Sequence, residues 1–242
     1  MFTAFVSDLH LAPDRPAEAA AFRGFLRAPL RQADALYILG DLFDHWAGDD
    51  ELSDGFNRDI ASDLRALTDS GVTAHLIHGN RDFLLRERFA AATGVRMLPD
   101  RVVVDLYGTP TLLMHGDLLC TQDRRYQAFR KLVRNRSVQR WFLRLPLARR
   151  KGVMGGARRM SEREKQAKQS RIMDVTLAAV DEAFRQFACA RLIHGHTHRP
   201  ARHEHVVDGR RCERWVLADW YEGGQYLRVT AAGCEPVRLP TG

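Results

Sequence analysis

Five short motifs of the 242-residue chain carry side chains that bind metal ions, and each follows a short apolar run typical of a buried strand. They are Asp8-Leu9-His10, Gly40-Asp41, Gly79-Asn80, His115-Gly116 and Gly195-His196-Thr197-His198. In an extended segment, side chains two residues apart point to the same side. The first and last motifs can therefore each direct two groups at one site. A neighbouring glycine lets the backbone approach a cation closely. We therefore predict one metal site built from Asp8, His10, Asp41, Asn80, His115, His196 and His198.

The mixture of imidazole, carboxylate and amide donors indicates which metal the site prefers. It suits Mn²⁺, Fe²⁺ or Zn²⁺ better than Ca²⁺ or Mg²⁺, and Mn²⁺ is the first choice. Two such ions about 3.5–4 Å apart can activate a water and neutralise a phosphoryl group, without a covalent enzyme intermediate. The remaining histidines are expected in core or surface roles, and His194 is the best candidate for a hydrogen bond to a ligand.

The hydrophobic pattern predicts the elements that must position these motifs. Strands are expected at 2–6, 35–39, 73–77, 102–107, 111–114, 191–193, 215–217, 226–230 and 235–239. Helices are expected at 16–30, at 51–69 and through a basic stretch that ends near 187. This order favours stacked sheets covered by helices, in a single domain spanning 1–242 with a helical insertion at about 123–170.

Composition narrows the class of protein. The chain is 45% hydrophobic and 28% charged, as ordinary globular proteins are. Its four cysteines form no C-x-x-C pair, which favours a reducing cytosol over a disulfide framework or a structural zinc site. We expect no signal peptide and no membrane-spanning helix.

In order along the chain, the five motifs resemble the calcineurin-like metallophosphoesterase superfamily. The resemblance implies an α/β fold, namely a four-layer α/β/β/α sandwich, with Asp41 bridging two metal ions. It further implies that one ion is held by Asp8, His10 and His198 and the other by Asn80, His115 and His196. The reaction would then take place at Asp41, Asn80, Arg81 and His115.

One departure from the superfamily pattern concerns the leaving group. Many members have His directly after Gly-Asn, where it protonates the leaving oxygen, whereas this chain has Arg81. Arginine does not donate a proton at working pH but binds phosphate through two parallel hydrogen bonds. A phosphate monoester, with a second pKa near 6, leaves unassisted far more readily than an alkoxide. Arg81 therefore favours cleavage of a pyrophosphate over cleavage of an ordinary phosphodiester.

Further segments resemble one branch, the UDP-2,3-diacylglucosamine hydrolases of lipid A synthesis. They include Gly40-Asp41-Leu42-Phe43-Asp44, Gly79-Asn80-Arg81-Asp82-Phe83, Ile172-Met173-Asp174-Val175 and Asp219-Trp220-Tyr221-Glu222. The resemblance implies attack of water at the α-phosphorus, giving UMP and 2,3-diacylglucosamine 1-phosphate. It places substrate-binding roles on Asn80, Arg81, Asp123, Tyr126, Arg158, Ser161, Lys165, Lys168 and His196.

The basic insertion is the strongest feature of the charge distribution. Residues 124–171 hold 17 Lys or Arg against two Glu, a net +15, whereas the whole chain carries +7. Interleaved apolar residues favour amphipathic helices that close over a lipid-linked substrate or dock on the anionic cytoplasmic face of the inner membrane. Two other interpretations stay open at this point: a nucleic-acid partner, and helices that only pack on one another while their cations are solvated. No obligate protein partner is evident.

Two alternatives to the favoured function follow. A metallophosphoesterase with the same metal site could act on nucleotides or nucleic acid, although Arg81 and the basic apolar insertion disfavour this. A scaffold protein without catalysis would have lost metal ligands, and all seven are present.

Overall fold

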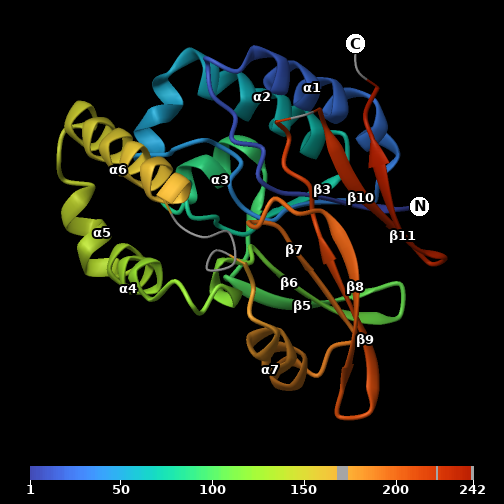
Figure 1. Ribbon diagram of the computed structural model, residues 1–242. Helices are drawn as coiled ribbons and strands as arrows, with labels where there is room; N and C mark the ends of the chain where they lie inside the picture. Colours follow the sequence, from blue (N-terminus) through green and yellow to red (C-terminus); the bar gives the residue numbers. More distant parts are fainter. Residues whose placement is uncertain (168–173, 222, 241–242) are drawn as a thin grey trace.

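The computed structural model describes residues 1–167, 174–221 and 223–240, and for 158–167 it describes the backbone alone. Two sheets form its centre (Figure 1). The first has the order β11-β10-β1-β2-β3-β4, and the second has the order β5-β6-β7-β9-β8. Their bounds are β1 Thr3–Val6, β2 Ala35–Ile38, β3 Thr73–Leu76, β4 Arg96–Met97, β5 Arg101–Leu106, β6 Thr109–Met114, β7 Arg191–His194, β8 Ala201–Val207, β9 Arg210–Val216, β10 Gln225–Thr230 and β11 Gly233–Arg238.

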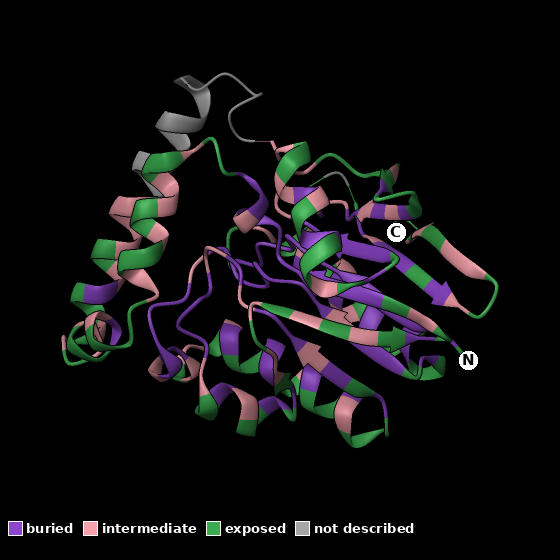
Figure 2. Cartoon of the chain, turned by 90° about the horizontal axis from the view of Figure 1, so that it is seen from below, coloured by how far each residue is buried: buried purple, intermediate pink, exposed green. Residues whose placement is uncertain are grey.

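Helices cover the outer face of each sheet. The first sheet is covered by α1 (Pro16–Arg27), α2 (Gly55–Asp69) and α3 (Glu87–Thr93), and the second by α7 (Leu177–Phe187). Strand alternation explains this packing, because Phe5 of β1 lies between the sheets while its neighbours Ala4 and Val6 face the helices. The layers are thus α/β/β/α, which confirms the predicted sandwich. Figure 2 shows the buried strands at its centre.

Local signals explain where helices begin and end. Pro16 occupies the first turn of α1, where its missing N–H costs nothing. Asp54 caps α2 by accepting from the backbone N–H of Phe56, and α2 buries Ile60, Leu64 and Leu67 on one side. The predicted helix at 51–69 is therefore two elements, a short 3-10 helix η2 (Asp49–Ser53) and α2, because Asp54 starts a new helix.

Strand register brings the motif-bearing loops to one edge. Strands β1, β2 and β3 are parallel, with Val6 paired to Ile38 and Ile38 to Leu76, so their following loops leave the sheet side by side. In the second sheet, β6 and β7 are also parallel, with Leu113 paired to Ile193. All five motifs follow these five strands.

The basic stretch forms three helices that stand to one side of the sandwich (Figure 1). They are α4 (Arg124–Val133), α5 (Arg136–Phe142) and α6 (Leu147–Ala167), and together they are called the arm below. That the arm acts as a lid stays a prediction. Within the described residues, no helix is both long and apolar enough to span a membrane.

Candidate metal centre

Backbone strain is concentrated at the predicted ligands. In the described part of the chain, eight non-glycine residues have positive φ, and five of them are Asp8, His10, Asp41, His196 and His198. Such a conformation costs an ordinary residue about 1–2 kcal/mol and is found mainly at functional sites. The strain turns each of these side chains away from its strand and into a shared space.

Asp8, His10 and His198 form one group of donors. Their ligand atoms lie within 4.8 Å of one another, and Asp8 Oδ1 is 3.5 Å from His198 Nε2. The other oxygen, Asp8 Oδ2, accepts a 2.8 Å hydrogen bond from the backbone N–H of His196. One carboxylate oxygen thus holds the loop after β7 while the other faces the centre of the group.

Asn80, His115 and His196 form a second and tighter group. Asn80 Oδ1 lies 3.0 Å from both His115 Nε2 and His196 Nδ1, and the two ring nitrogens are 3.2 Å apart. Donor atoms around a small divalent cation with bonds of about 2.1 Å lie about 3 Å apart. The spacing of this triangle therefore suits such an ion.

Asp41 lies between the two groups. Its Oδ2 is 3.8 Å from His10 Nε2 and 3.9 Å from His115 Nε2, while Oδ1 accepts a 2.8 Å hydrogen bond from the backbone N–H of Arg81. One oxygen is thus oriented by the protein and the other faces a histidine of each group. This is the position that a bridging ligand requires.

Unpaired buried atoms support a metal rather than a purely structural polar cluster. Both ring nitrogens of His10 and Oδ1 of Asp8 are buried and have no hydrogen-bond partner among the described residues. Leaving such atoms unpaired is costly unless a ligand satisfies them. Burial lowers the pKa of His10 to about 3, so its imidazole is neutral and offers a lone pair at physiological pH.

The electrostatics of the other ligands favour a cation as well. Burial raises the pKa of the Asp41 carboxyl, and the nearby charges of Asp82 and Asp8 add to this effect. Burial alone would lower the pKa of His115, but the carboxylates of Asp41 and Asp8 outweigh it and raise the pKa. Positive charge is therefore stabilised at this place, and a bound cation would replace the proton.

The motif glycines are explained by close packing among the ligand loops. A Cβ on Gly79 would lie 2.1 Å from Oδ1 of Asp41, and a Cβ on Gly195 would lie 2.2 Å from Oδ2 of Asp8. Neither space admits a side chain. These glycines let the loops approach one another so that the donors meet.

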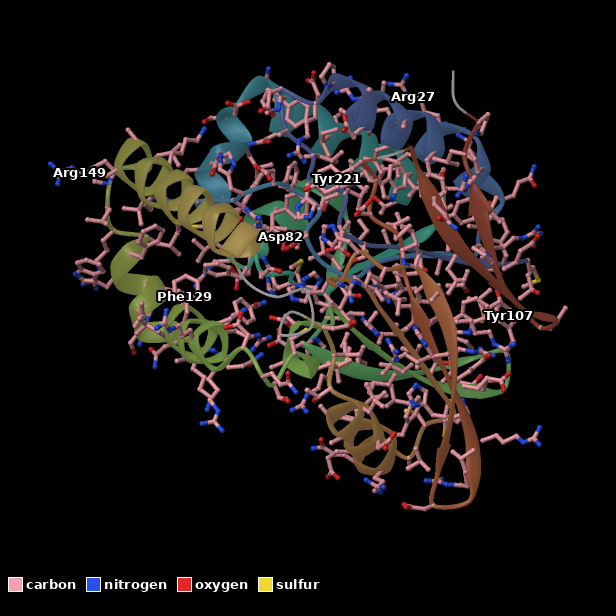
Figure 3. All side chains as sticks on the ribbon, viewed as in Figure 1. Arg27, Asp82, Tyr107, Phe129, Arg149 and Tyr221 are labelled. Atoms are coloured by element: carbon pink, nitrogen blue, oxygen red, sulfur yellow. The ribbon has the colours of Figure 1, made fainter. Side chains whose placement is uncertain are left out.

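Three supporting residues lie around the donors, and their roles were missed in the sequence. Asp219, in the loop after β9, is 2.8 Å from His198 Nδ1, and the Tyr221 ring stacks on His10 at 5.5 Å. Asp82 is fully buried and accepts from the backbone N–H groups of Leu42 and Gly79, which joins the loops after β2 and β3. Figure 3 shows Asp82 and Tyr221 in the central part of the molecule.

His194 lies beside the site as expected, but its hydrogen bonds go elsewhere. Its Nδ1 is 2.8 Å from the carbonyl of Gly195 and its Nε2 is 3.1 Å from Nη1 of Arg214. The partner of His115 is instead the backbone carbonyl of Leu39, 2.8 Å from Nδ1. Nδ1–H of His115 donates to this carbonyl. The lone pair of His115 Nε2 is therefore directed at Asn80 and His196.

The predicted substrate-binding residues fall into two sets. Asn80, Arg81 and His196 lie in the cluster, and Tyr126 stacks on His196 with ring centroids 6.1 Å apart. Asp123 caps α4 by accepting from the backbone N–H of Tyr126. The side chains of Arg158, Ser161 and Lys165, and the whole of Lys168, lie outside the described residues. Their roles stay predictions.

Comparison with known proteins identifies a family and several relatives of this chain. Residues 1–200 match the model of the calcineurin-like phosphoesterase family. The UDP-2,3-diacylglucosamine hydrolase of Aromatoleum aromaticum is 51% identical over 242 residues, covering 100% of this chain and 98% of the relative. That of Stenotrophomonas maltophilia is 50% identical over 240 residues, covering 96% of each. A solved archaeal phosphodiesterase aligns over 99% of this chain and 100% of its own, with a TM-score of 0.49 and 11% identity.

Proposed function

Since this chain belongs to the calcineurin-like phosphoesterase family, we propose that it hydrolyses the pyrophosphate bond of UDP-2,3-diacylglucosamine, a step of lipid A synthesis. The products are UMP and 2,3-diacylglucosamine 1-phosphate. The observation that carries this proposal is the convergence of seven donors from five loops, with the triangle at Asn80, His115 and His196 spaced for a cation. The identity of the substrate is proposed from the names of the two hydrolases that match nearly the whole chain.

Two divalent cations, which we propose to be Mn²⁺, would supply Lewis-acid activation of the attacking water and of the phosphoryl oxygens when bound. One ion would be held by Asp8, His10 and His198. The other would be held by Asn80, His115 and His196, and Asp41 would contact both ions. The protein itself orients these groups through Asp219, Asp82 and the carbonyl of Leu39.

Arg81 stabilises charge on the diphosphate. Its backbone N–H orients Asp41, and its guanidinium lies near enough to the donors to help lower the pKa of His10, after burial and the charge of His198. A guanidinium binds phosphate oxygens through two parallel hydrogen bonds but does not give up a proton. The leaving group must then depart as a weakly basic phosphate monoester, which fits cleavage of a pyrophosphate bond. Attack at the α-phosphorus is assigned from the resemblance to the UDP-2,3-diacylglucosamine hydrolases alone.

We also propose that the arm docks on the anionic cytoplasmic face of the inner membrane. Helix α4 has no buried residue; it packs Val133 and polar side chains on the sandwich, while Phe129 and Leu132 are 48% and 58% exposed. On α5, Trp141 is 64% exposed. Exposed cations lie among these side chains, and Figure 3 shows Arg149 of α6 pointing away from the sandwich. Each Lys or Arg near an anionic membrane adds about 1 kcal/mol of attraction.

One assay tests the reaction. Purified protein with Mn²⁺ and UDP-2,3-diacylglucosamine in ¹⁸O-water should release UMP that carries the label, because attack is at the α-phosphorus. EDTA should abolish release. His196→Ala should lower kcat at least about 100-fold, whereas His203→Ala, on β8 and outside the cluster, should not change it. Absence of UMP would refute the proposed substrate. Label in the sugar phosphate instead of in UMP would refute the assignment of attack to the α-phosphorus.

A second assay tests the membrane proposal. The protein should sediment with vesicles of phosphatidylglycerol and phosphatidylethanolamine. Trp141→Ser should lower the fraction of protein that sediments with them by more than half. Val206→Ser is the matched control, because Val206 on β8 is 72% exposed but lies outside the arm. If duplex DNA displaced the protein from vesicles at equal charge concentration, a nucleic-acid partner would be favoured instead.

A further inference from the structure

One face of α4 is built from polar side chains that reach the ligand loops. Tyr126 and Arg130 of α4, and Arg134 directly after its last residue, recur every four residues, so they lie one above another along the helix. All three contact residues next to predicted metal ligands. The arm is therefore joined to the metal centre by specific contacts.

The first contact is made at the loop after β6. Asp117, two residues beyond His115, is 2% exposed, and its Oδ2 accepts 2.6 Å hydrogen bonds from the Tyr126 hydroxyl and from Nε of Arg130. Arg130 also donates through Nη2 to Asp100 at 2.7 Å. Charge-assisted hydrogen bonds of this length are strong and directional. They fix the backbone that carries His115.

The second contact is made at the loop after β3. Nη2 of Arg134 donates to the carbonyl of Gly79 at 2.8 Å, and its guanidinium lies over the Phe83 ring at 5.6 Å. Gly79 immediately precedes Asn80. The guanidinium therefore holds both ends of the turn that presents the Asn80 amide.

The two halves of the centre are supported from different sides. Tyr126, which Arg130 orients through Asp117, packs on His196, so the arm contacts the surroundings of Asn80, His115 and His196. The other half is supported by the loop after β9, where Asp219 and Tyr221 contact His198 and His10. Within the described chain, contacts from α4 therefore orient the group of Asn80, His115 and His196 and not the group of Asp8, His10 and His198.

We propose that Arg130 and Arg134 are positioning residues that set the affinity of the cation held by Asn80, His115 and His196, while the other cation is bound independently of them. This inference rests on the metal site of the proposed function. Residues that hold ligands in place typically contribute 10–100-fold to metal affinity.

The experiment is a titration of the metal-free protein with Mn²⁺, in which free Mn²⁺ is measured by electron paramagnetic resonance. Wild type should bind two ions. In Arg130→Gln one binding step should weaken at least about tenfold while the other changes less than about threefold. Arg125→Gln is the matched control, because Arg125 lies on the exposed side of the same helix, and it should bind as wild type does. Asn80→Ala should affect the same step as Arg130→Gln.

Further readouts separate positioning from general stability. Raising the Mn²⁺ concentration should restore kcat of Arg130→Gln at saturating substrate, and Arg130→Lys should recover part of the lost affinity. If Arg130→Gln does not fold, the same titration of Arg134→Gln decides, since that change leaves the bonds to Asp117 intact. Two steps equal to wild type, or two steps weakened alike, would overturn the inference. A wild-type protein that binds no Mn²⁺ would instead overturn the metal site itself.

Discussion

Asp82 should be a costly carboxylate to remove although it is not a predicted metal ligand, because it joins two ligand loops at a fully buried position. Its Oδ2 accepts from the N–H of Leu42 and its Oδ1 from the N–H of Gly79, both at 2.8 Å. In Asp82→Ala both donors lose their partner. Each unsatisfied buried donor costs about 1–3 kcal/mol, so the two together cost about 2–6 kcal/mol.

One effect acts in the opposite direction. The charge of Asp82 contributes, after burial, to the raised pKa of Asp41, so its removal relieves repulsion between the two carboxylates. We therefore expect a net loss near the lower end of the range, about 2–3 kcal/mol. Asp82→Asn should lie between wild type and Asp82→Ala, since an amide oxygen still accepts one of the two N–H groups.

Urea unfolding in EDTA measures the loss as a shift of midpoint at constant m-value. The matched control is Asp105→Ala, which removes an acceptor 2.8 Å from the backbone N–H of Gly108 in an exposed hairpin. That change should cost about 0.5 kcal/mol or less. Equal losses in Asp82→Ala and Asp105→Ala would refute the reasoning, since they would mean that the buried loop junction adds nothing.

Three other outcomes are expected. Gly79→Ala should abolish UMP release, because its Cβ would collide with Asp41. Gly152→Ala in α6 should keep full activity, since a Cβ there meets nothing within 4 Å, and equal activities of the two variants would contradict the packing argument. Asp219→Asn should weaken Mn²⁺ binding about 10–100-fold in calorimetry, since Asp219 holds His198, and unaltered binding would count against that role. Mn²⁺ at 100 times the Kd of a site should stabilise the metal-free protein by about 2.7 kcal/mol for each ion bound, so a melting temperature that does not respond to Mn²⁺ would exclude binding to the native state.

The order of the fold was predictable where burial imposes a simple pattern. Strands such as β1 and β7 are buried at every residue, and they end directly before the motif residues. Strand β8 was missed because Arg202, His203 and Glu204 are all exposed along an edge, so no apolar alternation marks it. Helix α3 was also missed, since it has only seven residues.

The supports of the candidate site were less predictable than its donors. The donors stand in short motifs, whereas Asp219 lies 21 residues beyond His198 with no spacing that indicates a contact. The charge count of the arm likewise hid the pairing of its cations with residues of the sandwich. Lys151 pairs with Glu51, and Arg150 bonds the carbonyl of Ala47 and the carboxylate of Asp50, about a hundred positions away in the chain. Only folding brings these charges together, so a local window overstates how many cations are available to a ligand or membrane.

Backbone hydrogen bonds between neighbouring loops support the strained donors. The backbone N–H of Asp8 donates to the carbonyl of Gly40, and that of His10 donates to the carbonyl of Asp41. The loops after β1 and β2 thus hold one another in the left-handed conformation. A similar bond runs from Gly195 to the carbonyl of His115 in the second sheet. Because these bonds offset the strain, the backbone itself helps to hold the donors in the positions from which they converge.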